Sequence, residues 1–399
     1  MNIKDKKIIT LIFSSLAIIG LFASSASPIP LYSIYSHTIG LTTQDISLTA
    51  VFYFLGCICS LLFLTGLSDI FGRKITGLIA LGAGIIGVLL LIYAKNGSYI
   101  IAARLMQGLS CGLASNVFSL SISESGEGKV HPGVIGLILS SAIFVGLALG
   151  GVLSGGVVQL NPSAAPLVYW SLFCYLTVTA LGLILGVETK ISKKSLNLKI
   201  FIPNIGVPLD RTFVLSSSLV FLSSWAMGGY FQAYSSSISN QIYNLNSPLL
   251  SAIFLISYMV PNAVGSHLSS KMSKNVSIII GMVGYILSVS IFVVSLHFSL
   301  LILTIISIIG AGIFQGAAYR PAMQNILEGA LDYEKVKTIS YIYVLSYAGA
   351  GIPSFISGRM SQNITFLNIT LGYLLLVTTL GVMAIIALTM TIHNRKALE

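Results

Sequence analysis

The sequence predicts an all-α membrane protein whose twelve transmembrane helices form two pseudo-symmetric halves of six. Of the 399 residues, 55% are hydrophobic and only 8% are charged, and the mean hydropathy is +0.94. This composition excludes a water-soluble globular domain. The lipid bilayer is therefore the expected surrounding of the chain, and the first apolar stretch is predicted to be a retained span and not a cleaved leader.

Charged residues mark the loops between the predicted spans, because a spanning helix needs about 20 residues with few charges. Six helices are predicted before residue 188 and six after residue 211. Each of six stretches holds one helix: 8–44, 46–68, 75–94, 96–123, 338–358 and 360–394. Each of three longer stretches holds two: 130–187, 212–270 and 275–319.

A charged segment at residues 188–211 divides the chain. It is predicted to link an N-terminal bundle, residues 1–187, to a C-terminal bundle, residues 212–399, with a short amphipathic stretch on the membrane surface. Glycine patterns suggest a duplication: 107–112 is echoed by 310–316, and 146–150 by 349–358. The two echoes disagree in register, so the sequence leaves the pairing of the halves open. Duplicated bundles of this kind hold a substrate near the membrane midplane.

Basic residues indicate the orientation in the membrane. Of the 21 Lys and Arg residues, 17 fall on the side of the termini, and only Lys95 and Arg359 fall on the other side. Arg104 and Arg320 lie within or at the edge of helices. The positive-inside rule then predicts a bacterial inner-membrane protein with both termini in the cytoplasm. The net charge of +10 is explained by topology, and no nucleic-acid partner is predicted.

The loop after the second predicted helix reads Thr-Gly-Leu-Ser-Asp-Ile-Phe-Gly-Arg-Lys over residues 65–74. It resembles the signature of the major facilitator superfamily, with matches at Asp69, Gly72, Arg73 and Lys74 and departures at Thr65 and Ile70. A glycine at position 72 permits a tight reversal, and Asp69 can accept backbone N–H groups from the start of a neighbouring helix. The resemblance implies that this contact locks the cytoplasmic gate. A charged turn produced by the positive-inside bias is the alternative.

Two further segments resemble signatures of the same superfamily. Arg104-Leu-Met-Gln107-Gly resembles the Arg-x-x-Gln-Gly motif, and an arginine in a span is expected to point into a cavity or pair internally. It either tunes the pKa of a proton carrier or binds an anionic group, with snorkelling to the outer surface as the alternative. The 146–156 segment, with Gly150, resembles a motif associated with proton-linked exporters, although Gly151 replaces its proline. Helix packing explains the same spacing equally well.

A proton carrier is not evident. None of the eleven Asp and Glu residues lies in the middle of a predicted span, whereas proton-exchanging members of the superfamily usually carry a carboxylate on the first helix. Asp45, at the outer start of the second helix, is the nearest candidate. It is equally well placed as a helix-capping residue.

By resemblance, helices one, four, seven and ten line the substrate cavity. The candidate substrate-binding residues on them are Tyr32, Tyr35, Trp225, Phe231, Tyr234, Gln315 and Tyr319. An aromatic cavity with few charges suits amphipathic organic molecules better than sugars. Membership of the aromatic belts at the membrane surfaces is the alternative for each aromatic residue.

We therefore expect a monomeric secondary transporter, not an enzyme, that moves a small organic molecule by alternating access. Proton-coupled efflux of drug-like or metabolite compounds is favoured, and import or facilitated passage of a small solute is the alternative. No cofactor or metal is expected, because the four cysteines lie in apolar stretches without ligand spacing.

Overall fold

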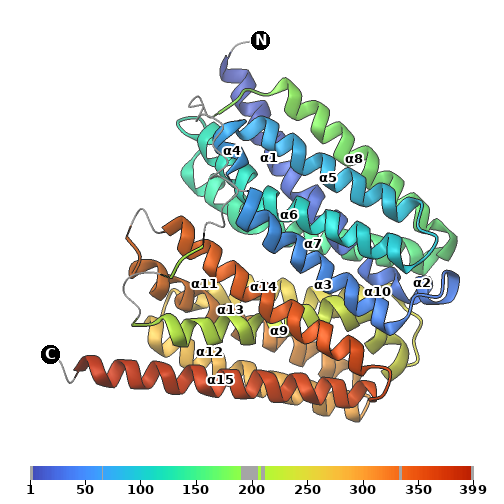
Figure 1. Cartoon of the computed structure of the whole chain (residues 1–399), viewed down its shortest axis with the longest axis vertical. Coiled ribbons are helices and arrows are strands. Elements are labelled where there is room, and N and C mark those ends of the chain that lie inside the picture. Colours follow the sequence, from blue (N-terminus) through green and yellow to red (C-terminus); the bar gives the residue numbers. More distant parts are fainter. Residues whose placement is uncertain (1–2, 65, 190–204, 208–211, 332–334, 397–399) are drawn as a thin grey trace. The chain divides into compact units, whose positions relative to one another are not determined.

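The computed structural model of the chain describes residues 3–64, 66–189, 205–207, 212–331 and 335–396. Every regular element in these ranges is helical, and twelve helical segments are long and apolar enough to cross a membrane (Figure 1). The predicted fold class and number of spans are confirmed. Most of the predicted linker, with its amphipathic stretch, lies outside the described residues.

The chain divides into two compact units. Unit 1 comprises residues 1–45, 52–203 and 247–252, and unit 2 comprises residues 46–51, 204–246 and 253–399. The predicted domain boundary at residues 188–211 stays a prediction.

The first half of the chain contains six spans. The first span is α1 (Ile3–Ala26), followed by η1 (Ile29–Leu31) and α2 (Tyr32–Thr38). The second is α3 (Thr43–Cys59), extended by the π-helical η2 (Ser60–Leu64) and followed by the short α4 (Leu67–Ile70). The others are α5 (Arg73–Ile92), α6 (Gly97–Gly126), α7 (Pro132–Leu160) and α8 (Ala165–Leu185), the last preceded by η3 (Pro162–Ala164).

The second half contains the remaining six spans. The seventh is α9 (Val214–Ser237), extended by the π-helical η5 (Ile238–Ile242), and the eighth is the pair α10 (Pro248–Met259) and α11 (Pro261–Ser269). The others are α12 (Lys274–His297), α13 (Leu301–Glu328), α14 (Lys335–Met360) and α15 (Phe366–Lys396).

Prolines and buried polar contacts explain where the helices depart from the predicted intervals. The first span breaks after Ala26, because Pro28 and Pro30 cannot continue the hydrogen-bond ladder. The tenth span continues past the predicted limit at residue 319 to Glu328. The charge of Arg320 is accommodated within this span, because its Nη1 donates to the carbonyl of Ser266 on α11 at 2.7 Å.

The two units repeat one packing pattern. In unit 1, α1 packs against α6, α7 and α8, while α5 packs against α6 and α8. In unit 2, α9 packs against α13, α14 and α15, while α12 packs against α13 and α15. Helices α1, α5, α6, α7 and α8 therefore correspond to α9, α12, α13, α14 and α15.

Close helix contacts fix the register of this repeat. At four glycines an added Cβ would lie against the backbone carbonyl of a neighbouring helix, so each glycine permits a close approach. These pairs are Gly108 with Tyr53, Gly112 with Cys57, Gly312 with Tyr258 and Gly316 with Asn262. The offset between halves is 204 for the glycines (108 to 312) and 205 for the carbonyls (53 to 258).

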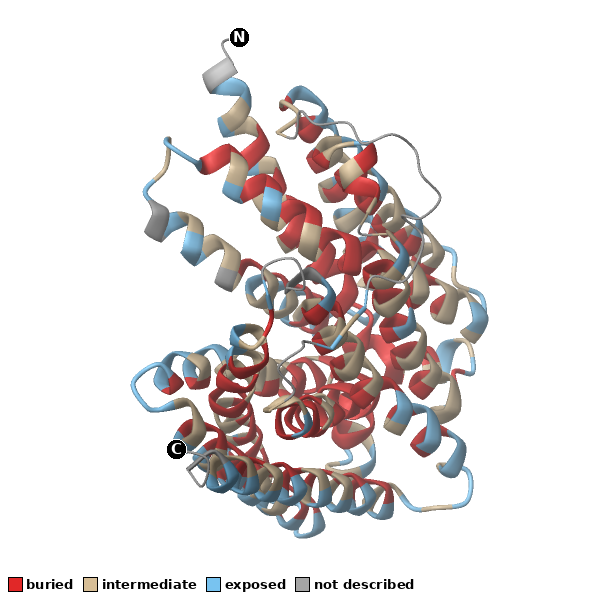
Figure 2. Cartoon of the chain, turned by 60° about the vertical axis from the view of Figure 1, so that its left-hand side comes forward, coloured by how far each residue is buried: buried red, intermediate tan, exposed pale blue. Residues whose placement is uncertain are grey.

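Apolar side chains cover the outside of the helices. The buried residues of α15 recur every three or four positions, at Ile369, Tyr373, Val377, Gly381, Ala384 and Leu388. Its other faces are largely exposed, as the helix leading to the C-terminus shows in Figure 2. Large exposed hydrophobic residues such as Leu375, at 68% exposure, are expected where a helix faces lipid.

Candidate functional site

A tight reversal precedes α5 at the signature loop. Gly72 has φ +86°, a left-handed conformation that side chains other than glycine rarely adopt, and it is the N-cap residue of α5. A Cβ at this position would also collide with the carboxylate of Glu188. The glycine is therefore required by the left-handed backbone, and a larger residue would also displace the Glu188 carboxylate.

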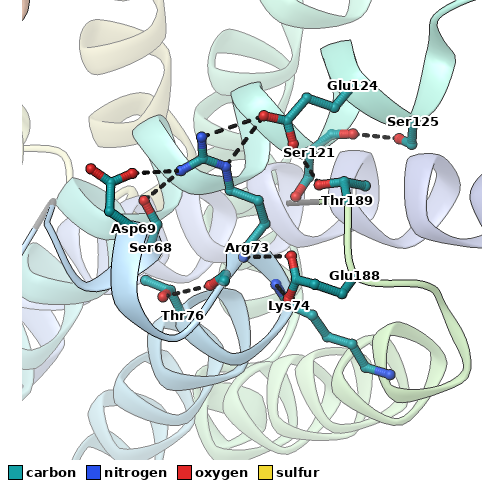
Figure 3. Close-up of polar contacts among 11 residues, drawn as sticks. Ser68, Asp69, Arg73, Lys74, Thr76, Ser121, Glu124, Ser125, Glu188 and Thr189 are labelled. Atoms are coloured by element: carbon teal, nitrogen blue, oxygen red, sulfur yellow. Dashed lines mark hydrogen bonds and ion pairs between the residues drawn. The ribbon is translucent and has the colours of Figure 1, made fainter. Parts of the chain in front are cut away.

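The Arg73 side chain contacts three polar groups from two helical segments, Ser68 and Asp69 on α4 and Glu124 on α6 (Figure 3). Nη1 donates to Ser68 Oγ at 2.6 Å, Nη2 lies 3.3 Å from Glu124 Oε1, and Asp69 Oδ1 is 3.8 Å from Nη1. Arg73 is buried, whereas Asp69 and Glu124 are partly exposed. This cation ties the end of α6 to the start of α5.

Glu188 completes the network and was missed by sequence reasoning, which placed it in the linker. Its carboxylate accepts the backbone N–H groups of Arg73 at 2.8 Å and of Lys74 at 3.0 Å. Lys74 Nζ in turn donates to the carbonyls of Ile184 and Gly186, at the end of α8. Thus Glu188, just after α8, binds the unpaired N–H groups at the start of α5, and Lys74 of α5 binds the unpaired carbonyl groups at the end of α8.

Residues next to Glu188 extend this hydrogen-bond network to α1 and α6. Thr189 Oγ1 donates to Glu124 Oε2 at 2.5 Å, and the Val187 N–H donates to Thr10 Oγ1 at 2.8 Å. At the start of α5, the carboxylate that accepts the backbone N–H groups is that of Glu188. The predicted contact of Asp69 with a neighbouring helix start, and its gating role, stay predictions.

Arg104 lies inside unit 1, with 1% of its surface exposed. Its Nη1 donates to the Ser25 carbonyl at 2.5 Å and to Gln107 Oε1 at 2.9 Å. Gln107 Nε2 donates to the Ser24 carbonyl at 2.7 Å, and the guanidinium lies 4.3 Å from the centroid of the Tyr53 ring. The pair therefore binds the carbonyl groups that α1 leaves open where it breaks.

Tyr35 lies in the short helix that follows this break. Its hydroxyl donates to the Tyr169 hydroxyl at 2.7 Å, and both side chains are buried. Tyr32, on the same helix, has no exposed surface. The hydrogen bond connects the first and sixth spans within unit 1.

Asp45 and Gly150 both have a structural task. Asp45 forms a capping box with Thr42: its Oδ2 accepts the Thr42 N–H at 3.0 Å, and its own N–H donates to Thr42 Oγ1 at 3.1 Å. A Cβ on Gly150 would collide with the Ala23 carbonyl, so this glycine allows α7 to approach α1. Their predicted roles in coupling stay predictions.

Half-buried aromatic residues gather in unit 2 around Trp225. The ring centroid of Trp225 lies 5.2 Å from that of Tyr347 and 6.5 Å from that of Tyr319, and Tyr347 stacks on Tyr343 at 6.0 Å. We call these four residues the aromatic cluster; they come from α9, α13 and α14. Tyr343 and Tyr347 were missed, although their spacing of four places them on one helix face.

The other predicted residues of unit 2 lie elsewhere. Phe231 is buried between Tyr258 and Phe292, with ring centroids at 5.0 and 5.4 Å. Tyr234 is buried and shares a hydrogen bond of 2.8 Å with Ser357 Oγ. Gln315 Oε1 accepts the Asn262 amide at 2.5 Å, which joins α11 to α13. The unit therefore brings together only Trp225 and Tyr319 of the four predicted aromatics.

Two cavities in unit 2 lie away from the aromatic cluster. One, of about 320 Å³, is an apolar space between α14 and α15. The other, of about 430 Å³, lies at the start of α12 and the end of α13. None of the predicted substrate-binding residues lines either cavity.

Comparison with known proteins gives the family. The sequence matches the Major Facilitator Superfamily over residues 12–354, and no curated protein sequence matches it. A crystal structure of the nucleoside transporter NupG has a TM-score of 0.67 and 13% identity, and that of a point mutant has 0.68 and 12%. Each covers 98% of this chain and 99% of its own.

Identities this low show a shared fold only, and they confirm the predicted facilitator fold. Because the family match covers most of the chain, the protein belongs to the major facilitator superfamily and is a secondary transporter of a small solute, not an enzyme.

Proposed function

We propose that the protein exports amphipathic organic molecules, of drug-like or metabolite chemistry, in exchange for protons. The proposed location is a bacterial inner membrane with both termini in the cytoplasm. This orientation is supported by the 17 basic residues on the side of the termini. A monomer carries out the transport.

The aromatic cluster is the observation that carries the substrate class. Trp225, Tyr319, Tyr343 and Tyr347 are only half-buried, and the one carboxylate on their helices α9, α13 and α14 is Glu328, at the end of α13. Exposed aromatic faces bind flat or apolar groups, while the tyrosine hydroxyls can orient a polar group. A sugar would require many more hydrogen-bond partners. The proposed substrate therefore carries an apolar or aromatic ring system.

Two features of unit 1 support alternating access driven by protons. The network around Arg73 fastens α5, α6 and α8 into one rigid end, which would move as a body when the gate opens. Arg104 places a cation within the unit, where it can lower the pKa of a nearby acid or attract an anionic group of the substrate. Asp45, which is partly exposed, is the proposed carboxylate in the coupling.

A flux assay in proteoliposomes tests the proposal. Purified protein is reconstituted with a pH-sensitive dye inside, and a panel of amphipathic amines, dyes and nucleosides is added under an imposed pH gradient. At least one amphipathic compound should move protons in the opposite direction to itself. No proton movement with any compound would refute the antiport mechanism.

Variants of the aromatic cluster test the substrate class separately. Trp225→Ala and Tyr347→Ala should each raise KM for the transported compound about tenfold, because an aromatic contact and its buried area are lost. Trp170→Ala is the matched control, since Trp170 on α8 is 41% exposed and lies in unit 1. Equal KM values for all three variants would contradict the assignment.

Import or facilitated passage of a small solute is the second candidate. The absence of a carboxylate from the middle of every predicted span favours it, because a proton antiporter needs a group that binds the proton. The same assay separates the candidates: uptake of a nucleoside or another nutrient without proton counterflow would support import.

A further inference from the structure

The start of α12 in unit 2 corresponds to the start of α5 in unit 1. In unit 1, Arg73 in the first turn of α5 pairs with Glu124 at the end of α6. In unit 2, Lys274 in the first turn of α12 pairs with Glu328 at the end of α13. Glu124 and Glu328 are separated by 204 residues, the same offset that relates the close-packed glycines of α6 and α13. The two carboxylates therefore match in the repeat, and each cation, Arg73 or Lys274, is the first residue of its helix, with an offset of 201 (73 to 274).

The two helix starts differ in what they face. In unit 1, the first N–H groups of α5 donate to the Glu188 carboxylate. In unit 2, the first residues of α12 line the cavity of about 430 Å³, together with Phe213, Asn325 and Glu328. The side chain of the N-cap residue, Ser273, makes no capping hydrogen bond. The cavity thus lies where unit 1 holds a carboxylate.

Asn325 gives independent evidence for a ligand. It lies on α13, lines this cavity, and has only 8% of its surface exposed. Its Nδ2 donor is buried and has no hydrogen-bond partner among the described residues. A buried amide without a partner costs free energy, so native proteins rarely retain one unless a ligand or another group satisfies it.

We propose that the cavity binds an oxyanion, namely a phosphate group. Its donors are the backbone N–H groups of Lys274 and Asn275, the Asn325 amide and the Lys274 ammonium group. A helix start attracts anions because its N–H groups and dipole point at them. The negative charge of Glu328 is offset by its ion pair with Lys274. The site is independent of the substrate proposed above.

The position of the cavity indicates two sources for this phosphate. The span Lys274–His297 begins at the cavity and the span Leu301–Glu328 ends at it. Because the ends of membrane-spanning helices lie near the lipid headgroups, we expect the cavity at that depth. The source is either the headgroup of an anionic phospholipid or free inorganic phosphate. Both present unprotonated, negatively charged oxygen atoms as acceptors to the donors of the site.

Native mass spectrometry of the full-length protein in detergent tests the lipid source, with phosphatidylglycerol as the probe. Thermal unfolding with added inorganic phosphate tests the free anion. One phosphatidylglycerol should be retained, or phosphate should raise the unfolding temperature. Asn325→Leu should weaken that binding about tenfold, as expected for one lost hydrogen bond to a charged group. Without ligand, the same variant should be no less stable, because it removes the unpartnered amide.

Two more variants keep the test decisive. Asn325→Asp places a carboxylate of the same shape at the site, as Glu188 does in unit 1, and should abolish binding. This variant replaces Asn325→Leu if the leucine variant fails to fold. Lys271→Gln changes an exposed lysine just before α12 and should alter affinity less than twofold. Retention of phosphatidylglycerol assigns the lipid source, and stabilisation by phosphate alone assigns the free anion. Binding of neither probe, or equal binding by wild type and both Asn325 variants, would overturn the proposal.

Discussion

Replacing Glu188 should loosen the end of unit 1 at which α5 begins. Its carboxylate accepts two backbone N–H groups, at 2.8 and 3.0 Å, from the first turn of α5. A buried hydrogen bond to a charged group contributes about 1.5–3 kcal/mol, but Glu188 is half-exposed and water can replace part of this. We therefore expect about 1–2 kcal/mol for Glu188→Ala, which is also the range for helix caps.

Glu188→Gln sharpens this expectation. The amide keeps one acceptor oxygen but presents an N–H₂ group to the second backbone donor, and it loses the charge that interacts with the helix dipole. We expect a loss of about 1 kcal/mol, between wild type and Glu188→Ala.

Equilibrium unfolding in mixed dodecyl maltoside and sodium dodecyl sulfate micelles measures both variants. Glu127→Gln is the matched control, because Glu127 is exposed and follows α6 at the same end of the unit. If Glu188→Gln and Glu127→Gln unfold at the same detergent fraction as wild type, the carboxylate does not stabilise the start of α5 and the reasoning is refuted.

Three other changes test the remaining contacts. Gly108→Val should lower the free energy of unfolding by more than about 2 kcal/mol, because its side chain would overlap the backbone of α3. Gly82→Val is the control: it has open space around it and should lower the free energy of unfolding by less than about 1 kcal/mol. Equal losses in the two variants would contradict close packing at Gly108. Single and double replacements of Tyr35 and Tyr169 by Phe should reveal a coupling energy of about 0.5–1.5 kcal/mol in the same assay, and additive effects would exclude their hydrogen bond. Arg104→Lys should retain less than about a tenth of the transport rate, because an ammonium group cannot reproduce the planar contacts of the guanidinium; a wild-type rate would show that the charge alone matters.

The signature loop shows how far sequence reasoning reaches at the candidate site. The Asp-x-x-Gly-Arg-Lys spacing indicated a tight reversal, and Gly72 has the required left-handed backbone. The carboxylate that meets the start of α5 could not be identified, because Glu188 lies 115 residues from Arg73 in sequence. Only the packing of α8 against α5 brings the two together.

The aromatic cluster illustrates a second limit. Analogy with related transporters directed attention to helices one, four, seven and ten, so Trp225 and Tyr319 were proposed while Tyr343 and Tyr347 on α14 were not. Phe231 was proposed because of its position on α9. The structure places it in the core, since α9 is covered by other helices around its circumference and buries most of its side chains.

The sequence by itself determined the membrane class, the twelve spans and the family, because apolar length, rare charges and short motifs are local properties. It also contained both glycine repeats, but not their alignment. Only the tertiary structure decided that Gly108 corresponds to Gly312, one helical turn from the match suggested by Gln107-Gly108 and Gln315-Gly316. The physical reason is that backbone contacts between helices, and not residue identity, determine the register. The same alignment relates Glu124 to Glu328 and shows that the carboxylate of Glu188 faces one helix start while a cavity faces the other.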